Sequence, residues 1–273
     1  MVLGASVLVY NALKIVIGVF NMTQLSEYRN LSKRSLIALS AGFLSILLFP
    51  TLALGRILGI WDSPLFLIGI TFFITIISMA TALIMGTKEI LNRGNLPWND
   101  MNVRIPFVSI VLGGAVAIPV LHFIYLGFTS PPIHDISTDT ANPPKFVSVL
   151  PERIETNAKN SADYNPTIAK MQNEGYPDIK PLNLPLPVNQ AFRQALEAVY
   201  SMDWRLVAAV PEEGRIEAVD ITFWSGFIDD IVIRVTPNGA SQSRIDVRSL
   251  SRVGGSDLGK NANRIRDYLN HLP

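Results

Sequence analysis

The sequence contains no cysteine. Disulfide bonds, thiolate zinc sites, haem attachment through cysteine and a cysteine nucleophile are therefore excluded. Histidine is scarce as well, and its only positions are His122, His134 and His271. The first lies in an apolar run, the second in a proline-rich stretch and the third at the end of the chain. A catalytic triad with a histidine base has little support from this distribution.

Charged residues make up only 16% of the chain, against roughly 25% in an ordinary soluble domain. The shortage lies in residues 1–130, which hold 8 Lys+Arg and 4 Asp+Glu, whereas residues 131–273 hold 15 and 18. The first half is therefore lipid-like and the second half resembles a soluble domain. The net charge of +1 provides no concentrated basic face, so we expect no nucleic-acid partner.

Several catalytic and cofactor motifs are missing too. The chain has no GxSxG, no Walker loop, no GxGxxG after a strand and no HExxH. The sequence therefore predicts no cofactor and no metal site, and it gives an enzyme no support. Chemistries that use Ser, Lys or Asp stay open.

Three long apolar runs dominate the first half, at about 35–55, 64–86 and 105–128. Each exceeds the roughly 18–20 apolar residues that a helix needs to cross a bilayer. None shows the alternation of a barrel strand. The pattern predicts an α-helical three-span transmembrane region over residues 35–129, with the lipid bilayer as a partner.

Residues 1–34 are harder to assign. Asn11 and Lys14 interrupt an apolar segment that lacks the basic start of a signal peptide. This segment is a fourth span, an interfacial helix or translation from an upstream start, with Met22 as the true one. Lys and Arg gather at 21–35 and 87–104, and the positive-inside rule makes both loops cytoplasmic. The second half then faces outward, which in a bacterium is the periplasmic side of the inner (plasma) membrane.

Proline and polar residues fill 130–186, which predicts an extended connection that is ordered only in part. Residues 187–273 are more regular and predict a soluble α+β domain. Apolar residues at spacings of three and four indicate a helix over 187–202. Four β-like runs follow, at 204–210, 215–223, 230–235 and 243–250, and a second helix closes the chain, with Ser256 or Asp257 as its N-cap.

The alternation in the last two runs predicts an antiparallel sheet with one buried face and one polar face. Ile231, Ile233 and Val235 share the apolar face. Arg234 belongs to the polar face, which also carries Arg244 and Arg248. We expect about four strands, with the two helices flanking them.

Four segments of the second half resemble the domain of unknown function 1499 family: IHDISTDTANPPKF (133–146), YPDIKPL (176–182), FIDDIVIRV (227–235) and RSLSRVGGSDLGKNANRI (248–265). The resemblance covers nearly all of 130–273, and members of this family often have preceding membrane spans. His134 stands where the family pattern has Asn, and Thr140 where it has Pro. The resemblance implies no known substrate, cofactor or catalytic residue.

The last of these segments is the main candidate site. A helix N-terminus beside guanidinium groups would suit a phosphate, a carboxylate or an anionic lipid headgroup. The alternative is structural, with a helix cap and arginines paired to carboxylates. The candidate residues are Arg248, Ser251, Arg252, Ser256, Asp257, Asn261 and Arg264.

Five further residues are secondary candidates: Asp135, Asp139, Asp229, Asp230 and Arg234. The first two, with His134, have the ligand types for a divalent cation, but prolines nearby favour turn formation. Asp229 and Asp230 are adjacent acids for general acid–base work. Neighbours in a strand point to opposite faces, so we expect one in a turn and the other on the polar face.

The hypothesis with most support is a non-catalytic envelope protein whose outward-facing domain binds a ligand, an anionic lipid or an envelope protein. The polar sheet face and the helix start at Ser256 and Asp257 would form the contact surface. One alternative is an enzyme that acts on envelope lipid or polymer. Another is a small transporter or its accessory subunit, which is weakened because the spans carry few ionisable residues.

Overall fold

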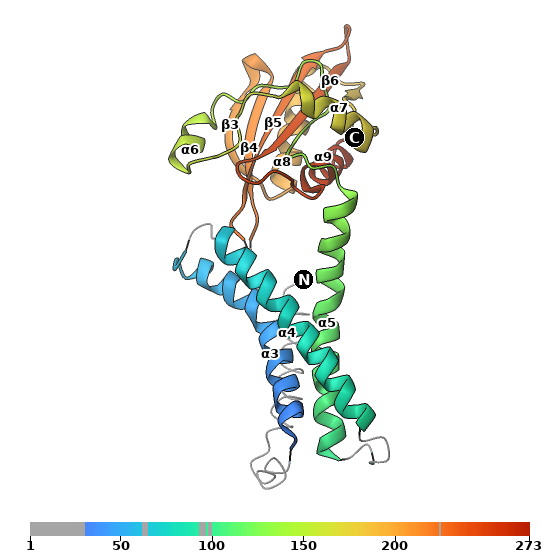
Figure 1. The fold of residues 1–273 in the computed structure, drawn as a ribbon. Helices are drawn as coiled ribbons and strands as arrows, with labels where there is room; N and C mark the ends of the chain where they lie inside the picture. The colour runs from blue at the N-terminus through green and yellow to red at the C-terminus, as the bar shows by residue number, and fades with distance from the viewer. Residues whose placement is uncertain (1–30, 62–64, 93–96, 98–99, 224) are drawn as a thin grey trace. The chain divides into compact units, whose positions relative to one another are not determined.

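The computed structural model describes residues 31–61, 65–92, 97, 100–223 and 225–273 (Figure 1). The chain forms two compact units. The first contains the chain up to Thr51 together with Phe66–Val120, and the second contains Leu52–Leu65 and Leu121–Pro273. The alternatives for residues 1–20 lie outside the described residues, as do Arg29 and Arg93 of the basic loops.

Three helices account for the apolar half: α3 (Lys33–Ile57), α4 (Leu65–Asn92) and α5 (Met101–Thr129). Each is long and apolar enough to cross a membrane. All three predicted spans are therefore confirmed as helices, and each helix extends a few residues beyond the predicted run. The extension is expected, because the polar ends of a spanning helix lie in the headgroup region, outside the hydrocarbon core.

Within the first unit, glycine lets α4 and α5 approach closely. A Cβ built on Gly86 would lie 2.9 Å from the carbonyl oxygen of Pro106, and one on Gly113 would lie 3.3 Å from that of Met79. Small residues at such crossings are typical of membrane helix pairs, because lipid gives no hydrophobic force that would hold helices together. The bundle therefore depends on close backbone packing.

A matched glycine pair tests this packing. Gly86→Ala is expected to destabilise the bundle by about 1–3 kcal/mol, since a backbone oxygen cannot yield to the new methyl group. Gly69→Ala on the same helix meets nothing within 4 Å, so it is expected to leave stability unchanged or raise it through helix propensity. Thermal unfolding of both full-length variants in one detergent measures the difference. Equal midpoints would contradict this account of the packing.

The second unit contains an antiparallel sheet in the order β1-β6-β5-β4-β3, with β2 also paired to β6. The predicted strands are present: β3 (Arg205–Val210), β4 (Arg215–Ile221), β5 (Ile228–Pro237) and β6 (Ser243–Ser251). A short 3-10 turn, η2 (Pro211–Glu213), joins β3 to β4. The predicted α+β class and the antiparallel pairing of the last two predicted strands, β5 and β6, are confirmed.

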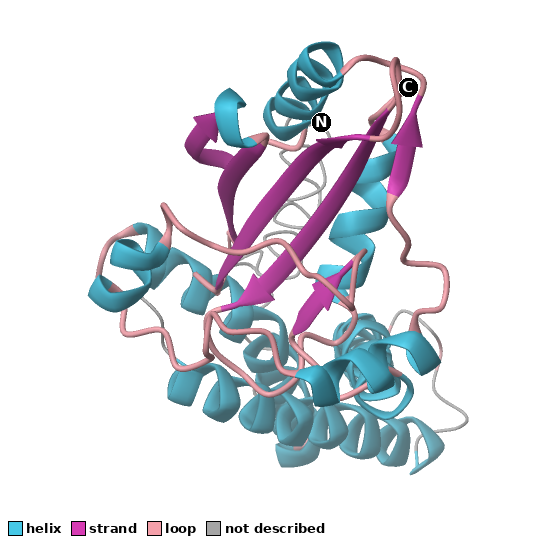
Figure 2. Ribbon diagram, turned by 90° about the horizontal axis from the view of Figure 1, so that it is seen from above, coloured by secondary structure: helices cyan, strands magenta, loops and turns pink. Residues whose placement is uncertain are grey.

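Helices α8 (Val188–Ser201) and α9 (Lys260–Asn270) cover one face of this sheet (Figure 2). The stripe of Ile231, Ile233 and Val235 lies buried beneath them, as the alternation predicts. Trp204 stacks on Tyr268 with their ring centroids 5.3 Å apart. The Tyr268 hydroxyl donates to a carbonyl of α8, so the two helices are also joined by a buried hydrogen bond.

The other face is not solvated, which corrects the prediction of an exposed polar face. The segment between α5 and α8 folds over this face and forms a second small core. That core is apolar, and its buried members are Phe146, Val149, Val219, Val232 and Leu250. A charged strand face can be covered in this way only if every charge finds a partner.

The proline-rich segment is accordingly more regular than predicted. It contains β1 (Asp135–Ser137), α6 (Leu150–Glu155), α7 (Pro166–Gly175) and β2 (Leu182–Leu184). Both strands pair with β6. Each has only three residues, too few to show an alternation that sequence reasoning could detect.

The last helix begins later than predicted. Leu258 and Gly259 have φ values of +55° and +82°, so neither residue can belong to a right-handed helix. The N-cap is Gly259 rather than Ser256 or Asp257. The Asp257 carboxylate nevertheless accepts hydrogen bonds from the backbone N–H groups of Gly259 and Asn261, at 2.9 and 2.8 Å. It satisfies donors at the helix start from outside the helix.

Candidate functional site

Arg248 lies on the face of β6 that the preceding segment covers, and its side chain is 2% exposed. Its Nε and Nη2 donate to the two carboxylate oxygens of Asp135 on β1, at 2.9 and 2.7 Å. The remaining donors reach backbone carbonyls, and the guanidinium lies against two aromatic rings; these partners are Pro144, Ala162, Phe146 and Tyr164. The structure therefore saturates Arg248 with internal partners.

Asp230 lies on the same face and takes two arginines. Arg252 Nε and Nη2 donate to its Oδ1 at 3.0 and 2.7 Å, and Arg153 of α6 donates to its Oδ2. Arg252 also donates to the Thr156 hydroxyl at 2.8 Å. Burial raises the pKa of Asp230 above its ordinary value even though both arginines act to lower it. These contacts join α6 to the middle of the sheet.

Asp229 points to the opposite face, towards α9. Arg264 Nη2 donates to Asp229 at 2.5 Å and to Asp220 at 2.6 Å. Lys260 Nζ lies 3.4 Å from Asp229. The prediction that one of Asp229 and Asp230 lies in a turn is wrong, because both belong to β5 and pair with β4 and β6. Asp230 lies on the polar face, as expected for the other of the pair.

Small polar side chains complete the cluster around Arg264. Asn261 Nδ2 donates to the Ser251 hydroxyl at 3.0 Å and to the backbone carbonyl of His134 at 2.9 Å. Arg264 Nη1 donates to Ser249 Oγ at 3.0 Å. Ser256 alone among the primary candidates is exposed, and its hydroxyl accepts from the Leu258 N–H. Anion binding by this motif stays a prediction, and the three guanidinium groups are already engaged by carboxylates.

Asp135 and Asp139, the acidic candidates near the start of the domain, contact different arginines. Asp139 accepts from Arg244 at 2.7 Å and from Arg234 at 3.3 Å, whereas Asp135 holds Arg248. Arg234 also donates to Asp246. Within the described ranges, no group of three or more His, Cys, Asp or Glu side chains has metal-site geometry. Asp135 and Asp139 serve as counter-ions to arginines.

Glu217 is a buried charged residue that sequence reasoning missed. It lies in the middle of β4 with no exposure and accepts from three consecutive backbone N–H groups, those of Val147, Ser148 and Val149, at 3.0, 2.9 and 2.9 Å. Arg215 donates to the same carboxylate. The three amides lie immediately before α6, so this charge fixes where α6 begins. A carboxylate flanked by apolar strand residues was the only signal in the sequence.

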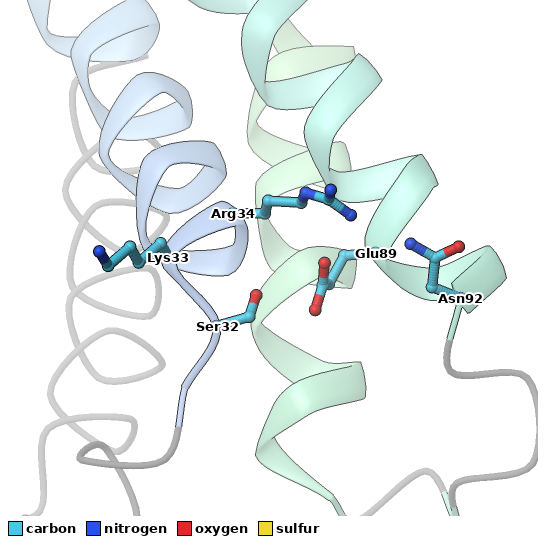
Figure 3. A pocket seen from close by; sticks show the side chains of 5 residues that line it. All are labelled: Ser32, Lys33, Arg34, Glu89 and Asn92. Atoms are coloured by element: carbon cyan, nitrogen blue, oxygen red, sulfur yellow. The ribbon is translucent and has the colours of Figure 1, made fainter.

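In the first unit, a polar cleft of about 460 Å³ lies between the start of α3 and the end of α4 (Figure 3). Its lining combines two cations with a carboxylate and two neutral polar groups, namely Lys33, Arg34, Glu89, Ser32 and Asn92. Figure 3 shows the Arg34 guanidinium directed towards α4, whereas Lys33 points away from it. The two cations belong to the basic segment 21–35 of the sequence.

Two acids near Arg264, Asp229 and Asp257, are predicted to affect the stability of the fold at neutral pH in opposite directions. Burial would raise the pKa of Asp229, but the charges of Arg264 and Lys260 outweigh burial and hold it below its ordinary 3.8. Asp229 therefore stabilises the fold fully above that value and loses its contribution as the pH falls through the lower folded pKa. Burial, with the Asp229 charge, raises the pKa of Asp257. Ionised Asp257 therefore costs stability at neutral pH.

Asp229→Asn is accordingly expected to lower the free energy of unfolding at pH 7 by about 3 kcal/mol, because Arg264 stays buried without its main partner. The free energy of unfolding of this variant should also fall less than that of the parent protein as the pH is lowered. Asp257→Asn is expected to change stability at pH 7 by about 1 kcal/mol or less, because relief of a buried charge offsets one lost backbone hydrogen bond. Urea unfolding from pH 3 to 7 measures both. Equal losses of stability in the two variants would contradict the opposite pKa shifts of Asp229 and Asp257.

The fold and these contacts define a class of protein: three candidate membrane spans followed by an α+β domain whose central charges are paired internally. Residues 135–272 match the family model described as "Protein of unknown function (DUF1499)". Because this match covers half of the chain, the protein belongs to the DUF1499 family, as the resemblance predicts. A search of the curated proteins found no match.

Proposed function

We propose that this protein is a non-catalytic, membrane-anchored component of the bacterial envelope. Its domain would lie on the outer side of the inner membrane and bind a protein partner through α6. The orientation is supported by the basic residues of segments 21–35 and 87–104, around the start of α3 and around the junction of α4 and α5, because positive loops stay cytoplasmic. With three spans, the chain after α5 then emerges on the opposite side.

The observation that carries the partner proposal is an exposed apolar surface. The segment that bears this surface is held to the sheet by buried polar contacts. The exposed fractions of Val147, Leu150 and Ile154 are 51%, 38% and 81%. We call these three residues the α6 surface. Beneath it, Glu217 binds the amides before α6 and Arg153 of α6 pairs with Asp230. A rigid apolar group of this kind is typical of a preorganised contact surface.

The ion pairs also argue against the enzyme alternative. A general acid or base must exchange a proton with a substrate. The predicted acid pair, Asp229 and Asp230, is divided between opposite faces, and each carboxylate is held by buried guanidinium groups. Both acids are at most 3% exposed. Neither has the access to solvent that acid–base work requires, which favours binding over catalysis.

Site-specific photocrosslinking in intact cells tests the partner proposal. A photoreactive residue in place of Ile154 is expected to give a discrete protein adduct, and one in place of Lys170, an exposed position on α7, is expected to give none. Leu150→Asp should abolish the adduct from position 154 while leaving the protein level unchanged. The same adducts from both positions, or none from position 154, would overturn the proposal.

The orientation has its own test. A compartment-sensitive reporter fused after Pro273 is expected to be active only outside the cytoplasm. A matched fusion after Asn92, at the end of α4, is expected to report the cytoplasm. Cytoplasmic activity from the fusion at Pro273 would exclude the outward orientation, whatever the crosslinking shows.

A further inference from the structure

The loop between β4 and β5, described at residues 222, 223 and 225–227, lies at the end of the sheet where the chain enters the domain from α5. Sheet register fixes this placement. Ile221 pairs with Ile228, and the next residue of β5, Asp229, pairs with Ser251. The backbone N–H of Ser251 then donates to the carbonyl of His134, just before β1. The loop and the entry of the chain are therefore at one end of the sheet.

That end cannot lie far from the membrane. Helix α5 has 29 residues, a length of about 43 Å, against a hydrocarbon core of about 30 Å. Its last turns carry exposed aromatics, Tyr125 at 61% and Phe128 at 88%, which are the residue types that concentrate at the bilayer interface. The residues between Thr129 and Asp135 span about 22 Å at full extension. The loop is therefore held within a short distance of the lipid headgroups.

The loop presents apolar side chains to its surroundings. Phe223 is 70% exposed and Ile221, at the end of β4, is 40% exposed. The backbone beneath them is tightly hydrogen-bonded, since the Thr222 N–H donates to Phe227 and the Gly226 N–H donates to Thr222, both at 2.8 Å. Exposed apolar groups on a fixed turn cost solvation unless something covers them.

We infer that Ile221 and Phe223, where β4 ends, insert into the bilayer interface and enter the headgroup region beside the end of α5. The occupant of this surface is lipid, because the chain between Thr129 and Asp135 keeps this end of the sheet within about 22 Å of the end of α5. This limit holds whichever side of the membrane the domain faces. A benzene ring and a branched aliphatic side chain both gain by leaving water for this region. The contact gives the domain a second attachment besides the chain itself. It does not depend on the partner proposed for the α6 surface.

The absence of native cysteine makes the test clean. Full-length protein with Ile221→Cys is labelled with an environment-sensitive fluorophore and reconstituted in phosphatidylcholine–phosphatidylglycerol vesicles that contain nitroxide lipid. The label is expected to be strongly quenched. The control is Ser241→Cys in the exposed β5–β6 turn, at the far end of a strand about 30 Å long, where little quenching is expected.

A second variant isolates the aromatic ring. Phe223→Asp in the Ile221→Cys background is expected to remove most of the quenching. Hydrogen exchange in β5 should stay unchanged, because the replaced side chain is largely exposed. An unquenched label at position 221 in the parent would overturn the inference, since purified vesicles contain no other partner. Equal quenching at positions 221 and 241 would overturn it as well.

Discussion

Arg248→Ala is expected to lower the free energy of unfolding by about 3–5 kcal/mol, the usual cost of breaking a buried ion pair by removing one partner. The carboxylate of Asp135 would stay 2% exposed without its two guanidinium donors. Its pKa is already raised by burial, so the variant should take up a proton more readily. Stability would be measured by urea unfolding of the full-length protein in detergent.

An exposed pair of the same geometry serves as the control. Arg266 donates to the two carboxylate oxygens of Asp178 at 2.6 and 2.9 Å, but the two side chains are 34% and 55% exposed. Arg266→Ala is expected to cost about 0–1 kcal/mol because solvent screens the pair. Similar losses in the two variants would show that burial does not set the energy of these contacts.

The double variant Arg248→Met with Asp135→Leu distinguishes a charge effect from a packing effect. Replacement of both partners by apolar groups removes the uncompensated charge, so most of the lost stability should return. Phe146 and Tyr164 would then pack against a methionine in place of a guanidinium. No recovery in the double variant would mean that Arg248 acts mainly through its contacts with those rings.

Glu217→Ala is expected to have the second-largest effect, a loss of about 3 kcal/mol or more. It leaves three consecutive buried or half-buried amides without an acceptor, and each such group costs about 1–3 kcal/mol. Glu217→Gln should lie between the parent and the alanine variant, because an amide presents only one acceptor oxygen. The NH₂ group of the substituted side chain would face a backbone donor at Val149, where the carboxylate now accepts.

Hydrogen exchange locates the change, and Glu213 supplies the control. Glu213 pairs with the same arginine, Arg215, at 2.8 Å but is 58% exposed, so Glu213→Ala should leave exchange unaltered. In Glu217→Ala, amides of residues 147–155 should lose protection while those of β5 keep it. The adduct expected from position 154 should weaken in parallel. Uniform loss of protection across the sheet would contradict a local role for Glu217 in fixing α6.

Much of this architecture follows from periodicity alone. The spans follow from uninterrupted apolar runs, α8 from its three-and-four spacing, and the antiparallel pair β5–β6 from the alternation in its two strands. These signals are local, since each helix or strand face repeats within a few residues. The alternation also puts Asp230 on the polar face of the sheet, although it does not extend to Asp229, which was expected in a turn.

The pairing of charges did not follow from the sequence, because the partners are remote along the chain. Arg248 finds Asp135, and Glu217 finds the amides of residues 147–149, through the way in which one segment folds over the sheet. A polar strand face has the same sequence pattern whether water or another segment covers it. The sequence therefore left two interpretations of the arginines in the closing motif, ligand contacts or pairs with carboxylates, and the structure gives each of them a carboxylate of this chain.

Strand β6 has a consequence for biosynthesis. It pairs with β1, β2 and β5, so the first strand of the domain obtains its partner only after more than 100 further residues, up to β6, have been made. A ribosome releases the C-terminal end last, and long-range pairing of this kind slows folding. Residues 130–242 must therefore remain without the pairing partner β6 until residues 243–251 have been made. Any factor that escorts this protein would act on the open chain, before β6 arrives.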